Sequence, residues 1–210
     1  MIDSINETTV DEWEAIGSVY RLISRLLISE VDADFLSILN RIPQRDAFIE
    51  LGGVLPKSND SDTIDDLAAD YCRLIIGPSG HFPPYQSVWE HGQFQSQTIE
   101  SMQSYSGIVR YTPSEAVGQM MLDHLGIQLD LMAHILTQIP TVSSASDRES
   151  VIEIASAFSI DHLQWADSML SAASDKAQTD FYQSAMKLIA QFLDSEKEFW
   201  NKTGQQNRAE

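Results

Sequence analysis

Apolar residues recur at three- and four-residue steps along nearly the whole chain, and this period constrains the fold more than any other feature. The first such stretch covers residues 9–28 and places Trp13, Tyr20 and Leu27 on one helical face. The same period predicts further helices over 34–41, 44–50, 63–76, 95–106, 113–139, 148–158, 161–173 and 176–199. No segment alternates apolar and polar residues between turns, so strands are not expected. The sequence predicts an all-α, single-domain-like helical bundle.

Turn and capping residues place the boundaries of these helices. Thr9 and Glu12 form a capping-box pattern at the first start, and Gly77-Pro78 ends the helix over 63–76. Pro113 suits a first helical position. The polar segment 141–147 is a candidate hinge between an N-terminal helical part (1–140), expected to carry the binding groove, and C-terminal helices (141–200) packing on the same core. Residues 201–210 are expected to be a disordered tail.

Charge is the strongest compositional feature. The 210 residues include 13 Lys and Arg against 31 Asp and Glu, a formal net charge of −18. Such a chain repels phosphate backbones and anionic bilayers but attracts basic peptides, although acidity can also serve solubility alone. No apolar run reaches a membrane span of roughly 20 residues, and the acidic N-terminus does not resemble a secretory signal. Nucleic-acid binding and stable membrane insertion are therefore not expected, and a cytoplasmic location is.

Most catalytic and metal-binding patterns are missing from the sequence. It has no phosphate-binding loop, no dinucleotide fingerprint and no His-Glu-x-x-His motif. Asp130 and His134 stand four residues apart and could share a helical face as metal ligands, but a site needs three or four convergent ligands. The single cysteine, Cys72, has no resolving partner and reads as a small core residue. Neither a metal site nor a catalytic cysteine is expected.

The pair Asp123-His124, inside an apolar run, is open to three interpretations. Adjacent residues on a helix point about 100° apart, so the two side chains should serve different neighbours rather than each other. His124 could cap a nearby loop while Asp123 faces water. The pair could instead act as a catalytic dyad, with His124 as the base. A carboxylate at the edge of a buried region, beside aromatic side chains, could also receive a guanidinium group.

Three motifs resemble the TorD/DmsD/NarJ family of molybdoenzyme maturation chaperones. Residues 71–89 join a helix, Gly-Pro, a loop and Pro-Pro-Tyr-Gln-Ser-Val-Trp. Residues 123–133 read Asp-His-Leu-Gly-Ile-Gln-Leu-Asp-Leu-Met-Ala, and residues 158–165 read Phe-Ser-Ile-Asp-His-Leu-Gln-Trp. The resemblance extends over about residues 10–200. The chain departs from the family at Gln86, where Glu or Gly is common, and at Trp89, where Tyr is common.

The resemblance implies a TorD-type helical fold without enzyme activity. It implies a cytoplasmic chaperone for an immature molybdopterin-dependent reductase, of the trimethylamine-oxide or dimethyl-sulfoxide type. Such a chaperone holds the twin-arginine leader, in which an apolar stretch follows two arginines, until the cofactor is inserted. The implied leader-binding residues are Tyr85, Trp89, Asp123 and His124, supported by Phe82, Pro84 and Ser87.

The resemblance also bears on ligands and assembly. It implies no resident cofactor, although some relatives bind guanine nucleotides weakly, and it allows either a monomer or a domain-swapped dimer. Two other function classes remain open from the sequence. One is a small helical hydrolase acting on a nucleotide, with His124 as base, and the other is a helical scaffold unconnected with export.

Overall fold

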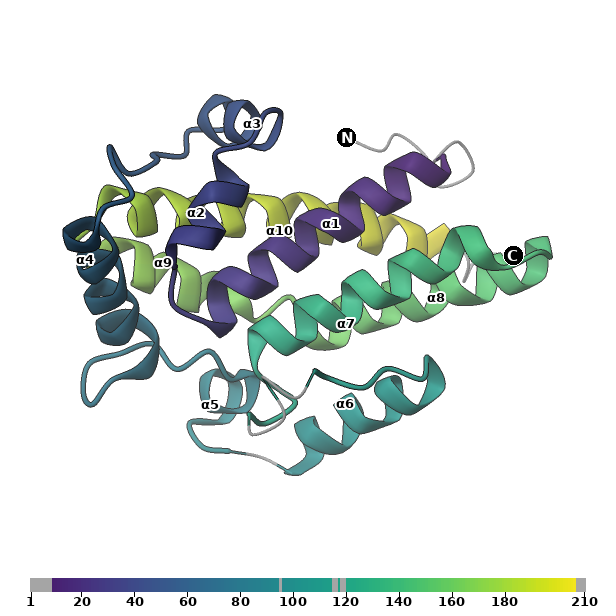
Figure 1. Cartoon of the computed structure of the whole chain (residues 1–210). Helices are drawn as coiled ribbons and strands as arrows, with labels where there is room; N and C mark the ends of the chain where they lie inside the picture. Colours follow the sequence, from purple (N-terminus) through teal and green to yellow (C-terminus); the bar gives the residue numbers. More distant parts are fainter. Residues whose placement is uncertain (1–8, 95, 115–116, 118–119, 207–210) are drawn as a thin grey trace. The chain divides into compact units, whose positions relative to one another are not determined.

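The computed structural model describes residues 9–94, 96–114, 117 and 120–206, with only the backbone described at 96 and 203–206. Its helices are α1 (Val10–Ile28), α2 (Ala33–Leu39), α3 (Gln44–Glu50), α4 (Ser61–Tyr71), the π-helical turn η2 (Cys72–Ile76), α5 (Gln86–His91), α6 (Ser96–Ile108), α7 (Leu125–Gln138), the 3₁₀ turn η4 (Ile139–Thr141), α8 (Ala145–His162), α9 (Ala166–Lys176) and α10 (Asp180–Gln206) (Figure 1). Over the described part of the chain there is no strand, only one isolated antiparallel bridge between Tyr85 and His124. The all-α prediction is confirmed.

Contacts group the chain into two compact units. Unit 1 comprises Met1–Ile28, Tyr85–Trp165 and Leu193–Glu210, and unit 2 comprises Ser29–Pro84 and Ala166–Phe192. The long helix α10 contributes its first half to unit 2 and its second half to unit 1. Neither unit begins or ends at residues 140–147, so a division there stays a prediction from the sequence.

Unit 1 is organised by the packing of α1 along α7, with α8 on α7 (Figure 1). Gly17 of α1 allows a close approach, because a Cβ there would lie 3.4 Å from Thr137 Cγ2. The Ser24 hydroxyl donates to the Gly126 carbonyl at 2.7 Å, which satisfies a buried polar group at the start of α7. Ten residues of α7 are buried, so this helix forms the centre of the unit.

Unit 2 is tied together by a buried carboxylate. Asp70, near the end of α4, is only 1% exposed. Its Oδ2 accepts hydrogen bonds from the Gln178 amide at 3.0 Å and from the amide and hydroxyl of Thr179, both at 2.7 Å. Its Oδ1 pairs with Arg73. Asp70 therefore joins α4 to the start of α10, where helix N–H groups otherwise lack partners.

The helix predicted over 113–139 is shorter than expected, and this prediction is wrong at its N-terminal end. The helix α7 begins at Leu125, and its N-cap is His124 in an extended conformation. The Asp123-His124 pair therefore lies on the segment before the helix. The physical reason is that both side chains accept hydrogen bonds from backbone N–H groups, which competes with continuing the helix.

Other boundaries follow local chemistry. Thr9 and Glu12 form the predicted capping box, since the Thr9 amide donates to Glu12 Oε2 at 2.6 Å and the Glu12 amide to Thr9 Oγ1 at 3.3 Å. Gly77, with φ of 94°, ends η2 as predicted.

At the C-terminal end of the chain, α10 continues to Gln206, so residues 201–206 are helical rather than a tail, and 207–210 lie outside the described residues. Within the described chain, none of the helices has the length and hydropathy to span a bilayer.

Candidate functional site

The Pro-Pro-Tyr turn and the Asp123-His124 segment meet in unit 1. The Gln86 amide donates to the Asp123 carbonyl at 3.1 Å, and Tyr85 pairs with His124 in the isolated bridge. Tyr85 is also the N-cap of the short helix α5, with extended backbone. Ser87 and Asp123 are 36 residues apart in the sequence. Backbone contacts nevertheless hold their two motifs side by side.

Asp123 is fully buried and caps the first turn of α5. Its Oδ2 accepts from the Ser87 amide at 3.1 Å and from the Ser87 hydroxyl at 2.6 Å. Its Oδ1 has no hydrogen-bond partner among the described residues. The expectation that Asp123 faces water is wrong, because α5 needs an acceptor at this end. A buried acceptor without a donor is uncommon and costs stability, so it marks this carboxylate as a candidate ligand-binding group.

His124 serves a different neighbour from Asp123, as predicted for adjacent residues. Its Nδ1 accepts a hydrogen bond from the Gly126 amide at 3.0 Å, so the ring is neutral and caps α7. Burial lowers the pKa of His124 to about 4. A base needs a free lone pair near its operating pH, and this lone pair is already used. The geometry therefore does not favour the hydrolase interpretation.

An aromatic cluster lies at the surface beside this pair. The ring of Tyr85 meets His124 edge-on at 5.1 Å between centroids and Phe94 at 5.3 Å. Phe94 is 54% exposed, and Tyr85 and Trp89 are half-buried. Burial, with a smaller effect of the Asp123 charge, raises the pKa of Tyr85. The sequence analysis missed Phe94, because it lies in a loop outside any motif.

The two remaining predicted residues belong to unit 2. Phe82 is half-buried, and its amide donates to the Leu74 carbonyl at 2.7 Å, which fixes the loop after η2. Pro84 is buried and ends that unit. The other five predicted residues, Tyr85, Ser87, Trp89, Asp123 and His124, all lie in unit 1.

Gln86 is the centre of a buried polar network that the sequence analysis did not predict. Its Oε1 accepts from Gln128 Nε2 at 2.7 Å and from His162 Nδ1 at 2.8 Å. Its Nε2 donates to the Asp161 carbonyl at 2.7 Å and to Glu90 Oε2 at 3.1 Å. Every hydrogen-bonding position of the amide is used, so its partners determine its orientation.

The network extends through His162 and Trp165. His162 Nδ1 donates to Gln86, so its Nε2 is the acceptor for the Ser101 hydroxyl at 2.9 Å. Burial, only partly offset by nearby carboxylates, lowers the pKa of His162 to about 4. Trp165 Nε1 donates to Gln128 Oε1 at 3.0 Å. One or more residues of each of the three sequence motifs therefore belong to one hydrogen-bonded network.

The alternative metal site does not form. Asp130 Oδ2 accepts from the Tyr111 hydroxyl at 2.7 Å, and His134 Nε2 donates to the Val109 carbonyl at 3.0 Å. The two side chains hold the segment after α6 instead of converging on an ion. Across the described residues, no group of three or more His, Cys, Asp or Glu side chains could hold a metal. Cys72 is half-buried and lies 3.5 Å from Glu30 Oε1; burial raises the pKa of its thiol, which disfavours a nucleophile.

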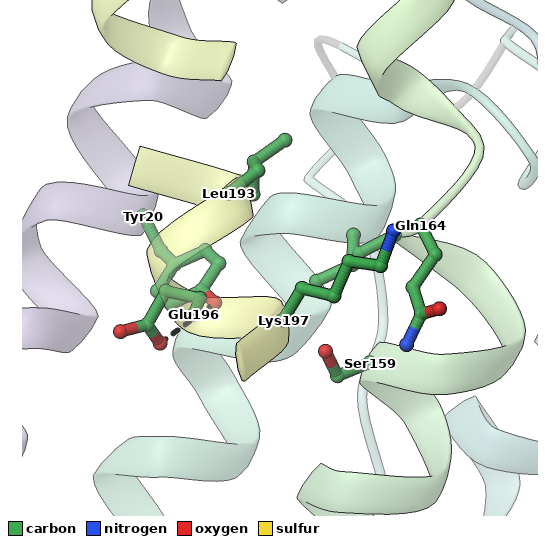
Figure 2. Close-up of a pocket in the computed structure, with 7 residues that line it drawn as sticks. Tyr20, Ser159, Gln164, Leu193, Glu196 and Lys197 are labelled. Atoms are coloured by element: carbon green, nitrogen blue, oxygen red, sulfur yellow. Dashed lines mark hydrogen bonds between the residues drawn. The ribbon is translucent and has the colours of Figure 1, made fainter. Parts of the chain in front are cut away.

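Unit 1 also encloses a small hollow between α8 and α10 (Figure 2). Glu196 lies at its edge and accepts hydrogen bonds from Tyr20 at 3.0 Å and from Trp200 at 3.2 Å. Burial raises the pKa of Glu196. Lys197 and Gln164 line the same hollow, whose volume of about 10 Å³ suits one water molecule. It is too small for a ligand.

The fold and the site define a class of protein before any relative is considered. The described chain is all-helical and joins a surface aromatic cluster to a fully buried carboxylate with one unpaired oxygen, which is the kind of arrangement that can receive a cationic group. Comparison with known families then identifies it: the chain belongs to the nitrate reductase delta subunit family, which matches residues 30–171.

Curated relatives carry the name chaperone protein TorD. The Vibrio cholerae serotype O1 protein is 25% identical over 142 residues, covering 66% of this chain and 64% of the relative. The Shewanella pealeana protein is 24% identical over 228 residues, covering 94% and 96%. The Vibrio vulnificus YJ016 protein is 25% identical over 160 residues, covering 73% of each. These names support a TorD-like chaperone and not an enzyme. No solved structure matches the chain.

Proposed function

We propose that this chain is a cytoplasmic chaperone that binds an immature molybdopterin-dependent reductase and its twin-arginine leader. It would keep the reductase open for cofactor insertion and delay its export. Membership of the nitrate reductase delta subunit family and the relatives named TorD support the maturation role. By the same relatedness, the client is of the trimethylamine-oxide or dimethyl-sulfoxide reductase type.

The observation that carries the leader-binding proposal is the unpaired Oδ1 of Asp123 beside the aromatic cluster. A guanidinium group offers planar N–H donors to a carboxylate and stacks on aromatic rings. Asp123 supplies the acceptor, and Tyr85 and Phe94 supply the rings. Because Asp123 is fully buried, an arginine reaches it only after side chains around the carboxylate move aside. The acidity of the chain steers a basic leader to the surface.

The variant Asp123→Asn tests the role of the carboxylate in binding while keeping its contacts in the folded chain. Asparagine keeps an oxygen for the Ser87 donors but removes the negative charge. We expect titration calorimetry to show a leader peptide binding the wild type, and at least about tenfold weaker binding to the variant, since charged hydrogen bonds contribute about 1.5–3 kcal/mol. Asp130→Asn, which removes a charge that faces Tyr111 instead, is the matched control and should bind like the wild type.

A twin-lysine version of the leader completes the test. Lysine keeps the charge but loses the planar donor fork, so its binding should be weaker than that of the twin-arginine peptide. Equal binding of both peptides would show attraction by charge alone and would contradict guanidinium recognition. If Asp123→Asn and Asp130→Asn weaken leader binding equally, Asp123 is not part of the binding site.

A further inference from the structure

His162 connects three helices of unit 1 through the two nitrogens of its ring. Its Nδ1 donates to Gln86 Oε1 of α5 at 2.8 Å, and its Nε2 accepts from the Ser101 hydroxyl of α6 at 2.9 Å. The residue itself ends α8 and is only 2% exposed. A neutral imidazole has one donor and one acceptor, so each contact uses its own nitrogen and neither nitrogen can replace the other.

The contact with Gln86 reaches the candidate site through α5. The Gln86 side chain is buried, and Gln128 Nε2 of α7 donates to the same amide oxygen at 2.7 Å. The Gln86 backbone amide donates to the Asp123 carbonyl at 3.1 Å. The partners of the Gln86 side chain therefore determine where the first turn of α5 lies against the segment that carries Asp123.

The next residue of α5 determines which oxygen of Asp123 stays unpaired. Ser87 follows Gln86 directly and donates both its amide, at 3.1 Å, and its hydroxyl, at 2.6 Å, to Oδ2 of the carboxylate. Oδ1 is left without a partner among the described residues. The six residues of α5 cannot hold this arrangement alone, because a helix this short depends on tertiary contacts.

We propose that His162 is a positioning residue that, acting through Gln86, fixes the orientation of the Asp123 carboxylate for a guanidinium group. This inference rests on the proposed function, which assigns the unpaired Oδ1 to an arginine of the leader. A guanidinium group offers its donors in a rigid planar fork, so its binding depends on the orientation of the carboxylate, whereas an ammonium group acts as a point charge. His162 should therefore affect the preference for arginine over lysine, which a residue that only stabilises the fold would not.

Two amide variants of His162 separate its two contacts. The amide nitrogen of asparagine lies at the same place along the side chain as Nδ1, and the amide of glutamine lies at the place of Nε2. His162→Asn therefore keeps a donor for Gln86 and gives up the contact with Ser101, and His162→Gln does the reverse. Both lose the ring, which packs on Tyr105 and Phe158 at centroid distances of 5.4 and 5.2 Å, so each variant is the matched control for the other.

Titration calorimetry with the twin-arginine and twin-lysine leaders gives the first readout. We expect the wild type and His162→Asn to prefer the arginine peptide to the same degree. In His162→Gln this preference should fall by about fivefold, which is the size expected for one net hydrogen bond. If both variants keep the wild-type preference, or both lose it equally, Gln86 does not transmit an effect of His162 and the inference fails.

Amide hydrogen exchange in the free chain gives a second readout that does not depend on the leader. The Ser87 amide should exchange about tenfold faster in His162→Gln than in His162→Asn. The reference is the Gly126 amide at the start of α7, whose acceptor lies outside this network. Equal exchange in the two variants would overturn the positioning role. If His162→Gln does not fold, Gln128→Met removes the other donor to Gln86 Oε1 and carries the same expectations.

The outcomes separate this inference from the proposed function. If the wild type prefers the arginine leader but the two His162 variants cannot be distinguished, the inference fails alone. If the wild type binds neither leader, or binds both equally, guanidinium recognition fails. Exchange of the Ser87 amide then still decides whether His162 positions Asp123.

Discussion

Gln86 and His162, 76 residues apart in the sequence, are joined by a buried hydrogen bond of 2.8 Å between the amide oxygen and Nδ1. The bond requires a proton on Nδ1 of the imidazole and an amide whose nitrogen points to Glu90 and Asp161. It connects the Pro-Pro-Tyr turn to the end of α8. The position of Tyr85 and of α5 therefore depends on residues far along the chain.

The variant Gln86→Glu should lower the free energy of unfolding by about 1–3 kcal/mol at neutral pH. A carboxylate oxygen would replace the amide nitrogen opposite Glu90 and the Asp161 carbonyl, which are both acceptors. A proton on the introduced carboxylate supplies a donor and relieves this conflict, so the loss should grow as the pH rises. Urea unfolding at two pH values measures it. The double variant with Glu90→Gln should regain part of the stability, and a variant as stable as the wild type would contradict the network.

Stability should fall as the pH falls from about 6.5 towards 4, because His124 and His162 are held neutral. Burial lowers the pKa of each to about 4, whereas unfolded histidine titrates near 6.5. Unfolding in this window takes up protons, so each histidine contributes a slope of roughly 1.4 kcal/mol per pH unit. Other groups also titrate, so the slope is compared between variants in urea at several pH values.

His124→Asn should reduce the dependence of the unfolding free energy on pH by the contribution of one histidine, roughly 1.4 kcal/mol per pH unit. Asparagine is a good N-cap, so the start of α7 keeps an acceptor for the Gly126 amide. His91→Asn is the matched control, because the His91 side chain is 50% exposed and lies outside the buried pair of histidines. An unchanged slope in His124→Asn would show that the ring is not held neutral in the folded chain.

Two glycine-to-alanine changes should have opposite signs. A Cβ at Gly126 would lie 2.5 Å from Ile28 Cγ1, so Gly126→Ala should destabilise unit 1 by about 1–3 kcal/mol through overpacking. A Cβ at Gly107, in α6, meets nothing within 4 Å, so Gly107→Ala should stabilise by up to about 1 kcal/mol. Thermal unfolding followed by circular dichroism distinguishes them. Equal melting temperatures would contradict the close contact of α1 with the start of α7.

Features that depend on neighbouring residues were predictable from the sequence. The capping box of Thr9 and Glu12, the stop at Gly77 and the helical class of the fold are local effects of backbone chemistry and apolar period. The site residues Tyr85, Asp123 and His124 were selected through their motifs, and their association is seen in the structure. That they bind a leader remains a prediction.

Features that depend on distant residues were not predictable. The apolar run before Leu125 looked helical, yet Asp123 and His124 are needed to satisfy backbone N–H groups of α5 and of α7, and this ends the helix. Gln86 carried no signal of its own, since a glutamine beside a proline turn is most often a surface residue. Its burial follows only from the meeting of α5, α7 and α8.

By itself, the sequence determined the helical class, the family, the acidity and the motif residues, because these follow from periodicity, charge and short-range order. Only the tertiary structure decided the burial of the Asp123 carboxylate, its single unpaired oxygen and the burial of Gln86. The physical reason is that a polar group's energy depends on which donors and how much water surround it. Packing between residues far apart in the chain sets both.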